Sequence, residues 1–469
     1  MTESETLFAS LRQAAHADVV DAIEQLVRDS PDHRLNRVNV LAFAVEHQLD
    51  EDRVIAGFLH AVRLGLFDLS WNVLCPGCGG VLDAGASLKN VNQPEYACAL
   101  CAAGYEPTLD EMVEVTFTVT PRARRIAAHS PDDLSPVEYC RQIFWSSGID
   151  LRDEAFTQVI DEITLELIEL PAGERAMLSL TLPEEFVIVF DPVTHFAQFI
   201  DVKGAPTREL QSLSIVFNRA HAHTTTITLQ PGPLRLALDN RTDTRIVPGV
   251  YIAGREMHDM LGKRRAFLTA KRLLTNQTFR ELYRTSTLDV DQRLKITSLT
   301  FLFTDLRGST DLYERVGDLV AFDIVKEHFR ILNEIISDES GAVVKTIGDA
   351  VMATFATPDR ALAAALRIRR AMRALNDERS NEDLLLKIGI HEGPCLAVTL
   401  NDRQDYFGQT VNIASRVQGL AMSQSILATG SVVDHPNAST LLETDGIHPV
   451  ARRLPLRGIA EELAVYEIP

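Results

Sequence analysis

The first part of the chain places its apolar residues in the pattern of amphipathic helices. Apolar positions recur every three or four residues within 19–23 and 54–62, and the acidic run at 50–52 suits the first turn of a helix. We therefore expect a helical domain over residues 1–70. Two interpretations stay open: a winged-helix-like bundle that reads nucleic acid, or a bundle that only packs or docks.

The middle of the chain shows short runs in which apolar and polar residues alternate. Such runs predict strands, and they occupy residues 113–119, 163–167, 177–182, 186–190, 226–229 and 234–238. We expect residues 111–255 to form a β-rich regulatory domain, either a sandwich or a partly closed barrel. His221 and His223 would share one face of a strand, and we interpret them as polar surface rather than as metal ligands.

Helical spacing returns between Glu256 and Arg284, and a short polar link follows. The basic amphipathic stretch 264–272 suits a helix that dimerises or transmits a signal. It suits equally a linker that packs on its own chain. We expect a helical linker over residues 256–296 and leave this choice open.

Four cysteines lie in two closely spaced pairs. Cys75 and Cys78 form one C-x2-C pair, and Cys98 and Cys101 form a second pair after nineteen intervening residues. Two tight turns that each present two thiolates make a closed tetrahedral site, so we predict a zinc ribbon over residues 71–110 with a structural Zn²⁺. A redox pair of dithiols is the alternative.

Composition narrows the classes of function. The chain has 469 residues, too many for one hydrophobic core, and a formal net charge of −19. Residues 1–110 hold 16 Asp and Glu against 7 Lys and Arg. These balances disfavour binding to nucleic acid or to anionic membranes. No run approaches 18 apolar residues and the acidic N-terminus carries no secretion signal, so we expect a cytoplasmic protein without a membrane span.

A carboxylate follows a buried strand in the last third of the chain. Residues 297–303 form a continuous β-like run, and Asp305 stands at its end. Gly308, Ser309 and Thr310 then begin a helix, whose free N–H groups can bind phosphate oxygens. A carboxylate beside such a loop offers the hard oxygen ligands that Mg²⁺ prefers.

A second carboxylate lies at the tip of a predicted β-hairpin. Residues 341–355 hold two apolar runs on either side of Gly348 and Asp349. If this hairpin lies beside the strand that ends at Asp305, the two carboxylates converge. Placing two negative charges together within a sheet is unfavourable, and shared cations would offset that cost. Taken alone, each Asp is more often a helix cap or a turn residue than a ligand.

Four motifs, in order, resemble the catalytic domain of class III nucleotidyl cyclases. They are F-T-D-L-R-G-S-T at 303–310, K-T-I-G-D at 345–349, G-I-H-E-G-P at 389–394 and D-Y-F-G-Q-T-V-N-I-A-S-R at 405–416. The resemblance covers residues 297–469 and implies a ferredoxin-like catalytic domain within a multidomain α+β protein. The cysteine region also resembles the N-terminal part of a bacterial cyclase subgroup.

The resemblance implies roles for four of these residues. Asp305 and Asp349 match the aspartates that bind two Mg²⁺ or Mn²⁺ ions, and Lys345 and Asp405 match the pair that selects the base. A lysine can donate to a ring nitrogen of adenine, and a carboxylate can accept from its amino group. Adenine, and therefore ATP, is the expected substrate.

The remaining implied roles concern the sugar and the phosphates. Asn412 and Arg416 lie four residues apart, hence on one face of a helix, and match the residues that position the ribose and stabilise the transition-state phosphate. Arg457 stands where the family often has a lysine, so a role on the terminal phosphates is expected with altered geometry. We interpret His391 as structural and Cys395 as a small buried residue.

The resemblance implies a homodimer with two composite sites, because family members take the metal ligands from one chain and the base, ribose and phosphate residues from the other. We expect an adenylate cyclase that forms 3′,5′-cyclic AMP and pyrophosphate, with a regulatory N-terminal region that binds a ligand or a protein. The alternatives are a guanylate cyclase, and a retired cyclase domain that binds a nucleotide or a partner.

Overall fold

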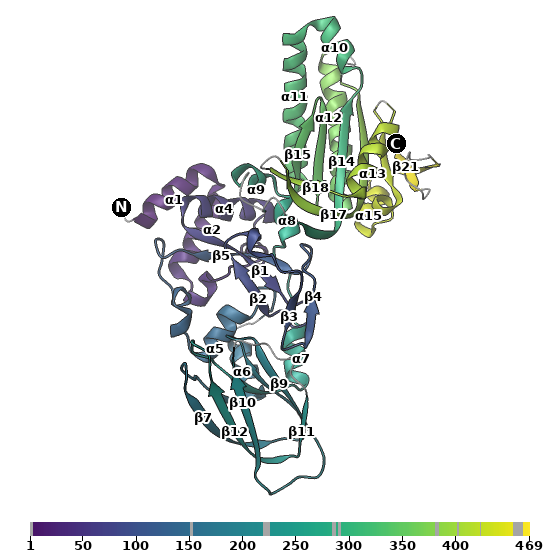
Figure 1. Cartoon of the computed structure of the whole chain (residues 1–469). Coiled ribbons are helices and arrows are strands. Elements are labelled where there is room, and N and C mark those ends of the chain that lie inside the picture. Colours follow the sequence, from purple (N-terminus) through teal and green to yellow (C-terminus); the bar gives the residue numbers. More distant parts are fainter. Residues whose placement is uncertain are drawn as a thin grey trace. The chain divides into compact units, whose positions relative to one another are not determined.

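The computed structural model describes residues 3–150, 153–218, 226–283, 288, 292–379, 384–400, 403–422, 424–453 and 463–469. The chain divides into two compact units (Figure 1). The N-terminal unit comprises Met1–Ala86, Asn90–Pro107 and Glu111–Leu268, and the C-terminal unit comprises Ser87–Lys89, Thr108–Asp110 and Thr269–Pro469. No helix among the described residues is long and apolar enough to cross a membrane.

The N-terminal unit begins with helices that pack around an aromatic cluster. The helices are α1 (Glu3–Ala14), α2 (Ala17–Asp29), α3 (Val40–His47) and α4 (Glu51–Leu64). Asn39 and Asp50 accept backbone N–H groups at the starts of α3 and α4, and Gly65 ends α4 with φ +80°. Phe58 of α4 is fully buried and contacts Phe43 and Phe117 edge-on or tilted.

A three-stranded antiparallel sheet follows these helices. Its order is β2 (Val81–Gly85), β1 (Phe67–Leu74) and β5 (Val113–Val119). The short pair β3 (Tyr96–Cys98) and β4 (Ala103–Tyr105) lies between β2 and β5 in the sequence.

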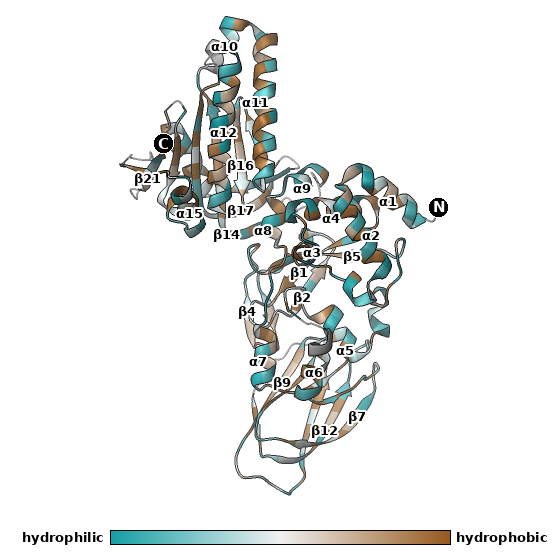
Figure 2. Cartoon of the chain, turned by 180° about the vertical axis from the view of Figure 1, so that it is seen from behind, coloured by the Kyte–Doolittle hydropathy of each residue, from teal (hydrophilic) through white to brown (hydrophobic). Residues whose placement is uncertain are grey.

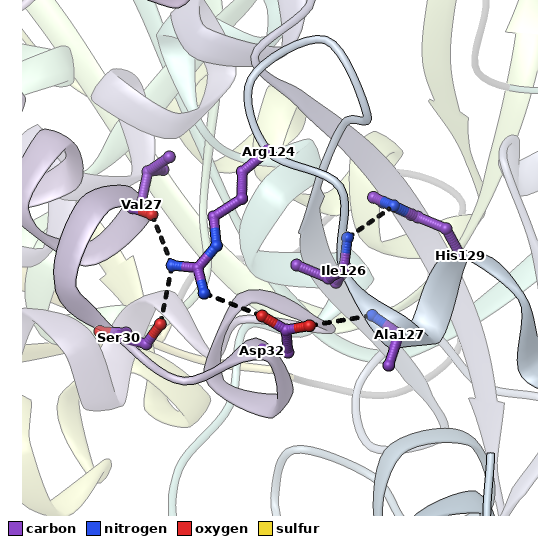
Figure 3. A network of polar contacts seen from close by, with 7 residues as sticks. All are labelled: Val27, Ser30, Asp32, Arg124, Ile126, Ala127 and His129. Carbon is purple, nitrogen blue, oxygen red and sulfur yellow. Dashed lines mark hydrogen bonds and ion pairs between the residues drawn. The ribbon is translucent and has the colours of Figure 1, made fainter.

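One arginine fixes the chain between α2 and α3 (Figure 3). Arg124 donates to the carbonyl oxygens of Val27 and Ser30 and forms an ion pair of 2.8 Å with Asp32. Asp32 also accepts from the backbone N–H of Ala127. These bonds satisfy carbonyl groups at the end of α2 that its own helix leaves free.

The β-rich part of the N-terminal unit consists of two sheets. One has the order β11 (Ile227–Leu229), β9 (Phe196–Val202), β8 (Phe186–Asp191), β13 (Gly249–Ile252) and β6 (Thr164–Leu167). The other has the order β10 (Gln211–Phe217), β12 (Gly232–Asn240) and β7 (Arg175–Leu182). Inward-facing residues such as Leu236 and Val189 share one buried core. Two sheets that bury a common core make a sandwich-like arrangement.

The basic stretch 264–272 is not one helix. The structure instead has α7 (Arg255–Gly262), α8 (Ala270–Leu274) and α9 (Gln277–Leu282), and the caps Thr269 and Asn276 begin the last two. Arg264 and Arg265 lie outside these helices and donate to carbonyl oxygens of Gly77 and Ser147. Their side chains therefore bind their own chain, as a packed linker would.

The C-terminal unit is built on an eight-stranded sheet. Seven strands follow the order β15 (Gly341–Ile347), β16 (Ala350–Phe355), β14 (Leu294–Leu306), β17 (Leu386–Leu400), β19 (Ile426–Thr429), β21 (Ala464–Ile468) and β20 (Val450–Arg453), and β18 (Arg403–Phe407) pairs with β17. Besides α8 and α9, the described helices of this unit are α10 (Ser309–Val316), α11 (Asp318–Asp338), α12 (Pro358–Arg379), α13 (Gln409–Leu420), α14 (Gly430–Val433) and α15 (Pro436–Thr444).

Helices cover the sheet because each has an apolar face. Brown and teal positions alternate along α11 and α12 (Figure 2), and buried residues of both helices join the core with β14, β16 and β17. Ile413 and Val417 of α13 belong to a separate cluster with Leu427 and Val465.

A short segment from early in the sequence belongs to the C-terminal unit. Leu109 donates its N–H to the carbonyl oxygen of Lys295 at 2.9 Å, and Thr297 donates to the carboxylate of Asp110 at 2.6 Å. Lys271 forms an ion pair of 3.1 Å with the same carboxylate. Residues 108–110 therefore brace the start of β14.

Candidate active site

Asp305 lies near the end of a central strand. β14 pairs with β16 on one side and β17 on the other, so its middle is fully buried. Asp305 itself is partly exposed, and its register partner on the neighbouring strand β17 is Lys387. Gly308 takes φ +72°, which glycine adopts at little cost, and α10 begins at the next residue. The side chains of Ser309 and Thr310 lie outside the described residues.

Asp349 lies at the tip of the hairpin formed by β15 and β16, as the sequence predicts. Gly348 supplies the positive φ, +64°, that the tight turn requires. The register pairs Thr304 of β14 with Val351 of β16. Asp305 and Asp349 therefore stand at the same end of two adjacent strands, where the sequence analysis expects them.

The two carboxylates stand at the same end of neighbouring strands and influence each other electrostatically. Burial raises the pKa of Asp305 above its usual range, the charge of Asp349 raises it further, and Lys387 and Gln418 oppose the shift. The Oδ2 atom of Asp349 is buried and accepts no hydrogen bond from the described residues. Paired carboxylates with an unused buried oxygen are chemically suited to hold divalent cations.

A histidine that the sequence analysis missed lies beneath this hairpin. His328 of α11 is completely buried, its Nδ1 lies 3.5 Å from the sulfur of Met372, and the backbone of Asp349 is within reach of the imidazole. Burial lowers the pKa of His328 to about 4, although the charge of Asp349 opposes this shift. The ring is therefore neutral at pH 7. Its only sequence signal is an apolar-face position in a long helix.

Lys345 and Asp405 meet directly. The Nζ of Lys345 on β15 lies 2.5 Å from Oδ2 of Asp405 on β18, and the Asp405 side chain is about nine-tenths buried. The other carboxylate oxygen accepts the backbone N–H of Tyr406 at 2.9 Å. Arg280 of α9 donates to the carbonyl oxygens of Val344 and Gln404, next to both members of the pair. The structure thus joins the two predicted base-selecting residues.

Asn412 and Arg416 share the exposed face of α13. Ile413 and Val417 on the opposite face are buried, which turns the other two outward. Among the described residues, neither Asn412 nor Arg416 forms a hydrogen bond or ion pair with Asp305 or Asp349. A single chain therefore leaves this pair facing solvent.

Two other residues of the motifs are buried. His391 binds the hydroxyl of Thr429 through Nδ1 at 2.8 Å, and burial lowers its pKa to about 4. Burial raises the pKa of Cys395 to about 12, so its thiol is unreactive. Arg457, His221 and His223 lie outside the described residues.

The four cysteines of the N-terminal unit converge. Their Sγ atoms all lie within 4.8 Å of one another, with 3.6 Å between Cys75 and Cys101 and 3.7 Å between Cys78 and Cys98. These separations are far too long for disulfides. They match the edge of about 3.8 Å expected for a tetrahedron with Zn–S bonds of about 2.3 Å. A C-β atom on Gly77 would lie 3.0 Å from the Cys101 sulfur, so the turn packs tightly on the cluster.

Two family models match the chain. Residues 1–281 match a family described as "Family of unknown function (DUF5939)", and residues 292–455 match "Adenylate and Guanylate cyclase catalytic domain". The second match confirms the resemblance of the C-terminal motifs to class III cyclases. It also assigns that region the mixed helix-and-sheet cyclase fold.

The relatives include proteins named as adenylate cyclases and proteins named as guanylate cyclases. An adenylate cyclase of Anabaena cylindrica is 31% identical over 185 residues, which are 36% of this chain and 36% of that protein. Guanylate cyclase 32E of Drosophila melanogaster is 29% identical over 140 residues, 27% of this chain and 12% of that protein. The chain spans 36% of the length of the Anabaena cylindrica protein. It spans 27% and 44% of the lengths of two receptor-type adenylate cyclases, from Trypanosoma congolense and Trypanosoma equiperdum.

Among solved structures, the adenylyl cyclase CyaB from P. aeruginosa matches with a TM-score of 0.34 and 22% identity, over 38% of this chain and 96% of that one.

Proposed function

Because the chain belongs to the DUF5939 family over residues 1–281 and carries an adenylate and guanylate cyclase catalytic domain over residues 292–455, we propose that it converts ATP to 3′,5′-cyclic AMP and pyrophosphate. The cyclase domain implies a nucleotide substrate. The observation that carries the choice of ATP is the contact of 2.5 Å between Lys345 and Asp405.

This pair matches the hydrogen-bonding edge of adenine. The ammonium of Lys345 donates to a ring nitrogen, and the carboxylate of Asp405 accepts from the exocyclic amino group. At the equivalent two positions guanine presents the O6 carbonyl oxygen and the N1–H group, so an acceptor would meet the carboxylate and a donor would meet the ammonium. The ion pair holds each side chain near the other before a base arrives, which lowers the entropic cost of binding.

Asp305 and Asp349 would hold two Mg²⁺ or Mn²⁺ ions. The unused, buried Oδ2 of Asp349 and the raised pKa of Asp305 both fit residues that need cations beside them. Bound metals would acidify the ribose 3′-hydroxyl and neutralise the triphosphate. The neutral His328 under the hairpin adds no positive charge that would compete with the cations.

The remaining residues act on the sugar and the phosphates. Backbone N–H groups at Gly308, Ser309 and Thr310, at the start of α10, would bind phosphate oxygens. Asn412 positions the ribose, and Arg416 meets the charge that develops on the α-phosphate, with Arg457 on the terminal phosphates. Because Asn412 and Arg416 face solvent in one chain, we place them opposite the aspartates of a second chain in a homodimer.

The N-terminal region has a regulatory role in this proposal. It consists of a helical bundle, a zinc ribbon held by Cys75, Cys78, Cys98 and Cys101, and a β-rich domain with a sandwich-like core. The zinc would be structural, since four thiolates leave no open coordination position. The helical linker then leads to the catalytic domain.

Product analysis tests the reaction. The purified chain is incubated with ATP or GTP and with Mg²⁺ or Mn²⁺, and the products are separated by chromatography. Cyclic AMP should be the main product. Cyclic GMP as the main product would favour the guanylate cyclase alternative, and no product with nucleotide binding retained would favour a retired domain.

A further inference from the structure

A polar cavity lies in the N-terminal unit, outside the β-sandwich core. Its volume is about 380 Å³, within the range of small-molecule sites. It is lined by residues from the end of α2 through α3 (within 26–46), by residues within 141–150 and by Arg265. The Arg124 bonds shown in Figure 3 hold the segment at the end of α2 that leads into this wall.

The cavity is cationic although the chain is acidic. Four arginines line it, Arg34, Arg37, Arg141 and Arg265, against the carboxylates of Glu46 and Asp150. Arg34 is paired with Glu46. Arg141 is paired with Glu138 at 3.4 Å. Arg37 and Arg265 donate to backbone carbonyl oxygens rather than to carboxylates, so their charge can attract an anion into this concave wall.

Arg37 is held in place at a conformational cost. It takes φ +48°, which is uncommon for a residue with a side chain. Its N–H donates to the hydroxyl of Thr118 at 3.0 Å, and its guanidinium donates to the carbonyl oxygen of Ile143. Burial lowers the pKa of Arg37, and the buried carboxylate of Glu114 offsets that shift. Surrounding bonds therefore fix a cation in this wall.

Two buried polar atoms in residues of this wall lack a hydrogen-bond partner. Gln142 is 7% exposed, and its Nε2 donates to Glu138, which turns Oε1 away from that carboxylate. Gln142 Oε1 and the hydroxyl of Ser146, which is 4% exposed, make no hydrogen bond with the described residues. Most buried polar atoms are paired, so two unpaired ones in one wall indicate a missing partner.

We propose that this cavity binds a small organic anion that carries a carboxylate or phosphate together with a hydroxyl or amino group. The anionic group meets the arginines, and the donor group meets Gln142 Oε1. Ser146 can donate or accept. Trp145 and Phe43, both almost fully buried, supply an apolar wall for the carbon skeleton.

Calorimetry on the full chain tests this site with three probes. L-malate carries two carboxylates and a hydroxyl, succinate is the same skeleton without the hydroxyl, and 3-phosphoglycerate adds a phosphate. We expect saturable binding of L-malate or 3-phosphoglycerate, at least about threefold tighter for malate than for succinate. The better of the two anions identifies the preferred acid group. Binding must persist with a non-hydrolysable ATP analogue present, which excludes the nucleotide site.

Two variants locate the binding. Arg265→Gln should weaken it about tenfold or more, since a charged hydrogen bond is lost. Ser146→Ala should weaken it about threefold without lowering the melting temperature, because it removes a buried hydroxyl that has no partner. Arg235→Gln is the matched control: it makes the same change at an exposed position on β12.

Three results would overturn the proposal. The first is no binding of any probe up to about 10 mM. The second is an affinity that neither Arg265→Gln nor Ser146→Ala changes, and the third is an equal loss of affinity in Arg235→Gln. The first would mean that the cavity holds only water.

Discussion

The ammonium of Lys345 and the carboxylate of Asp405 lie 2.5 Å apart although sixty residues separate them in the sequence. The contact joins β15, at the edge of the main sheet, to β18, which pairs with β17. Because β15 and β18 are not neighbours in the sheet, strand pairing alone does not create this contact. A bulge in β15 between Val343 and Lys345 shifts the register beside it.

Asp405→Asn should lower kcat/KM for ATP about tenfold or more, because a hydrogen bond to a charged group is worth about 1.5–3 kcal/mol. Activity with GTP should change less, so the preference for ATP should shrink. Steady-state kinetics with both nucleotides measure this. Asp377→Asn on the exposed face of α12 is the matched control, and an unchanged ATP preference in Asp405→Asn would remove this residue from base selection.

Mixing two inactive variants should restore activity if the sites are shared between chains. Asp349→Ala removes a proposed metal ligand and Arg416→Ala removes the proposed phosphate contact. A random 1:1 mixture should recover about a quarter of the natural rate, since half of the dimers then carry one intact site. A mixture of Asp305→Ala with Asp349→Ala should recover no activity, because each variant chain lacks one of the metal ligands that its own site needs. Equal recovery in the two mixtures would contradict the shared site.

His328 should make the C-terminal unit sensitive to acid. Its pKa is about 4 in the folded chain and about 6.5 in an unfolded chain. The unfolded chain thus binds more protons between these values, and the stabilisation present above pH 6.5 is lost as the pH falls towards 4. The loss is on the order of 3 kcal/mol.

Urea unfolding from pH 7 to pH 4.5 measures this loss. His328→Leu should lose less stability over that interval than the natural chain. His391, also buried and neutral, stays in both proteins as an internal reference. Parallel stability curves would show that the acid sensitivity arises elsewhere.

The cysteine cluster should carry one zinc per chain by elemental analysis. Cys98→Ser should lose the metal and lower the melting temperature, because the N-terminal unit then lacks a cross-link between two distant turns. Cys140→Ala changes a buried cysteine outside the cluster and should retain the metal. A metal-free natural chain with unchanged stability would favour the dithiol alternative.

Local sequence predicted the parts of the catalytic region that depend on local rules. Asp305 at a strand end and Asp349 at a hairpin tip follow from apolar runs and from glycines that permit tight turns. The two cysteine pairs converge, as the predicted four-thiolate site requires.

Features that depend on distant contacts were not predictable. The stretch 256–284 is divided into three helices because Thr269 and Asn276 cap new ones, and Arg264 and Arg265 bind remote carbonyl groups instead. His328 shows the same limit, since nothing in its own helix indicates that the backbone of Asp349 lies above it. The cationic cavity joins residues more than a hundred positions apart.

The brace formed by residues 108–110 bears on how the catalytic part can be isolated. A fragment that begins at residue 292 would keep every catalytic motif but lose Asp110 and Lys271, together with the N–H of Leu109 that binds Lys295. The leading end of β14 would then be an unprotected edge, open to pairing with other molecules. Aggregation or weak activity of such a fragment would reflect its missing support and would say little about regulation.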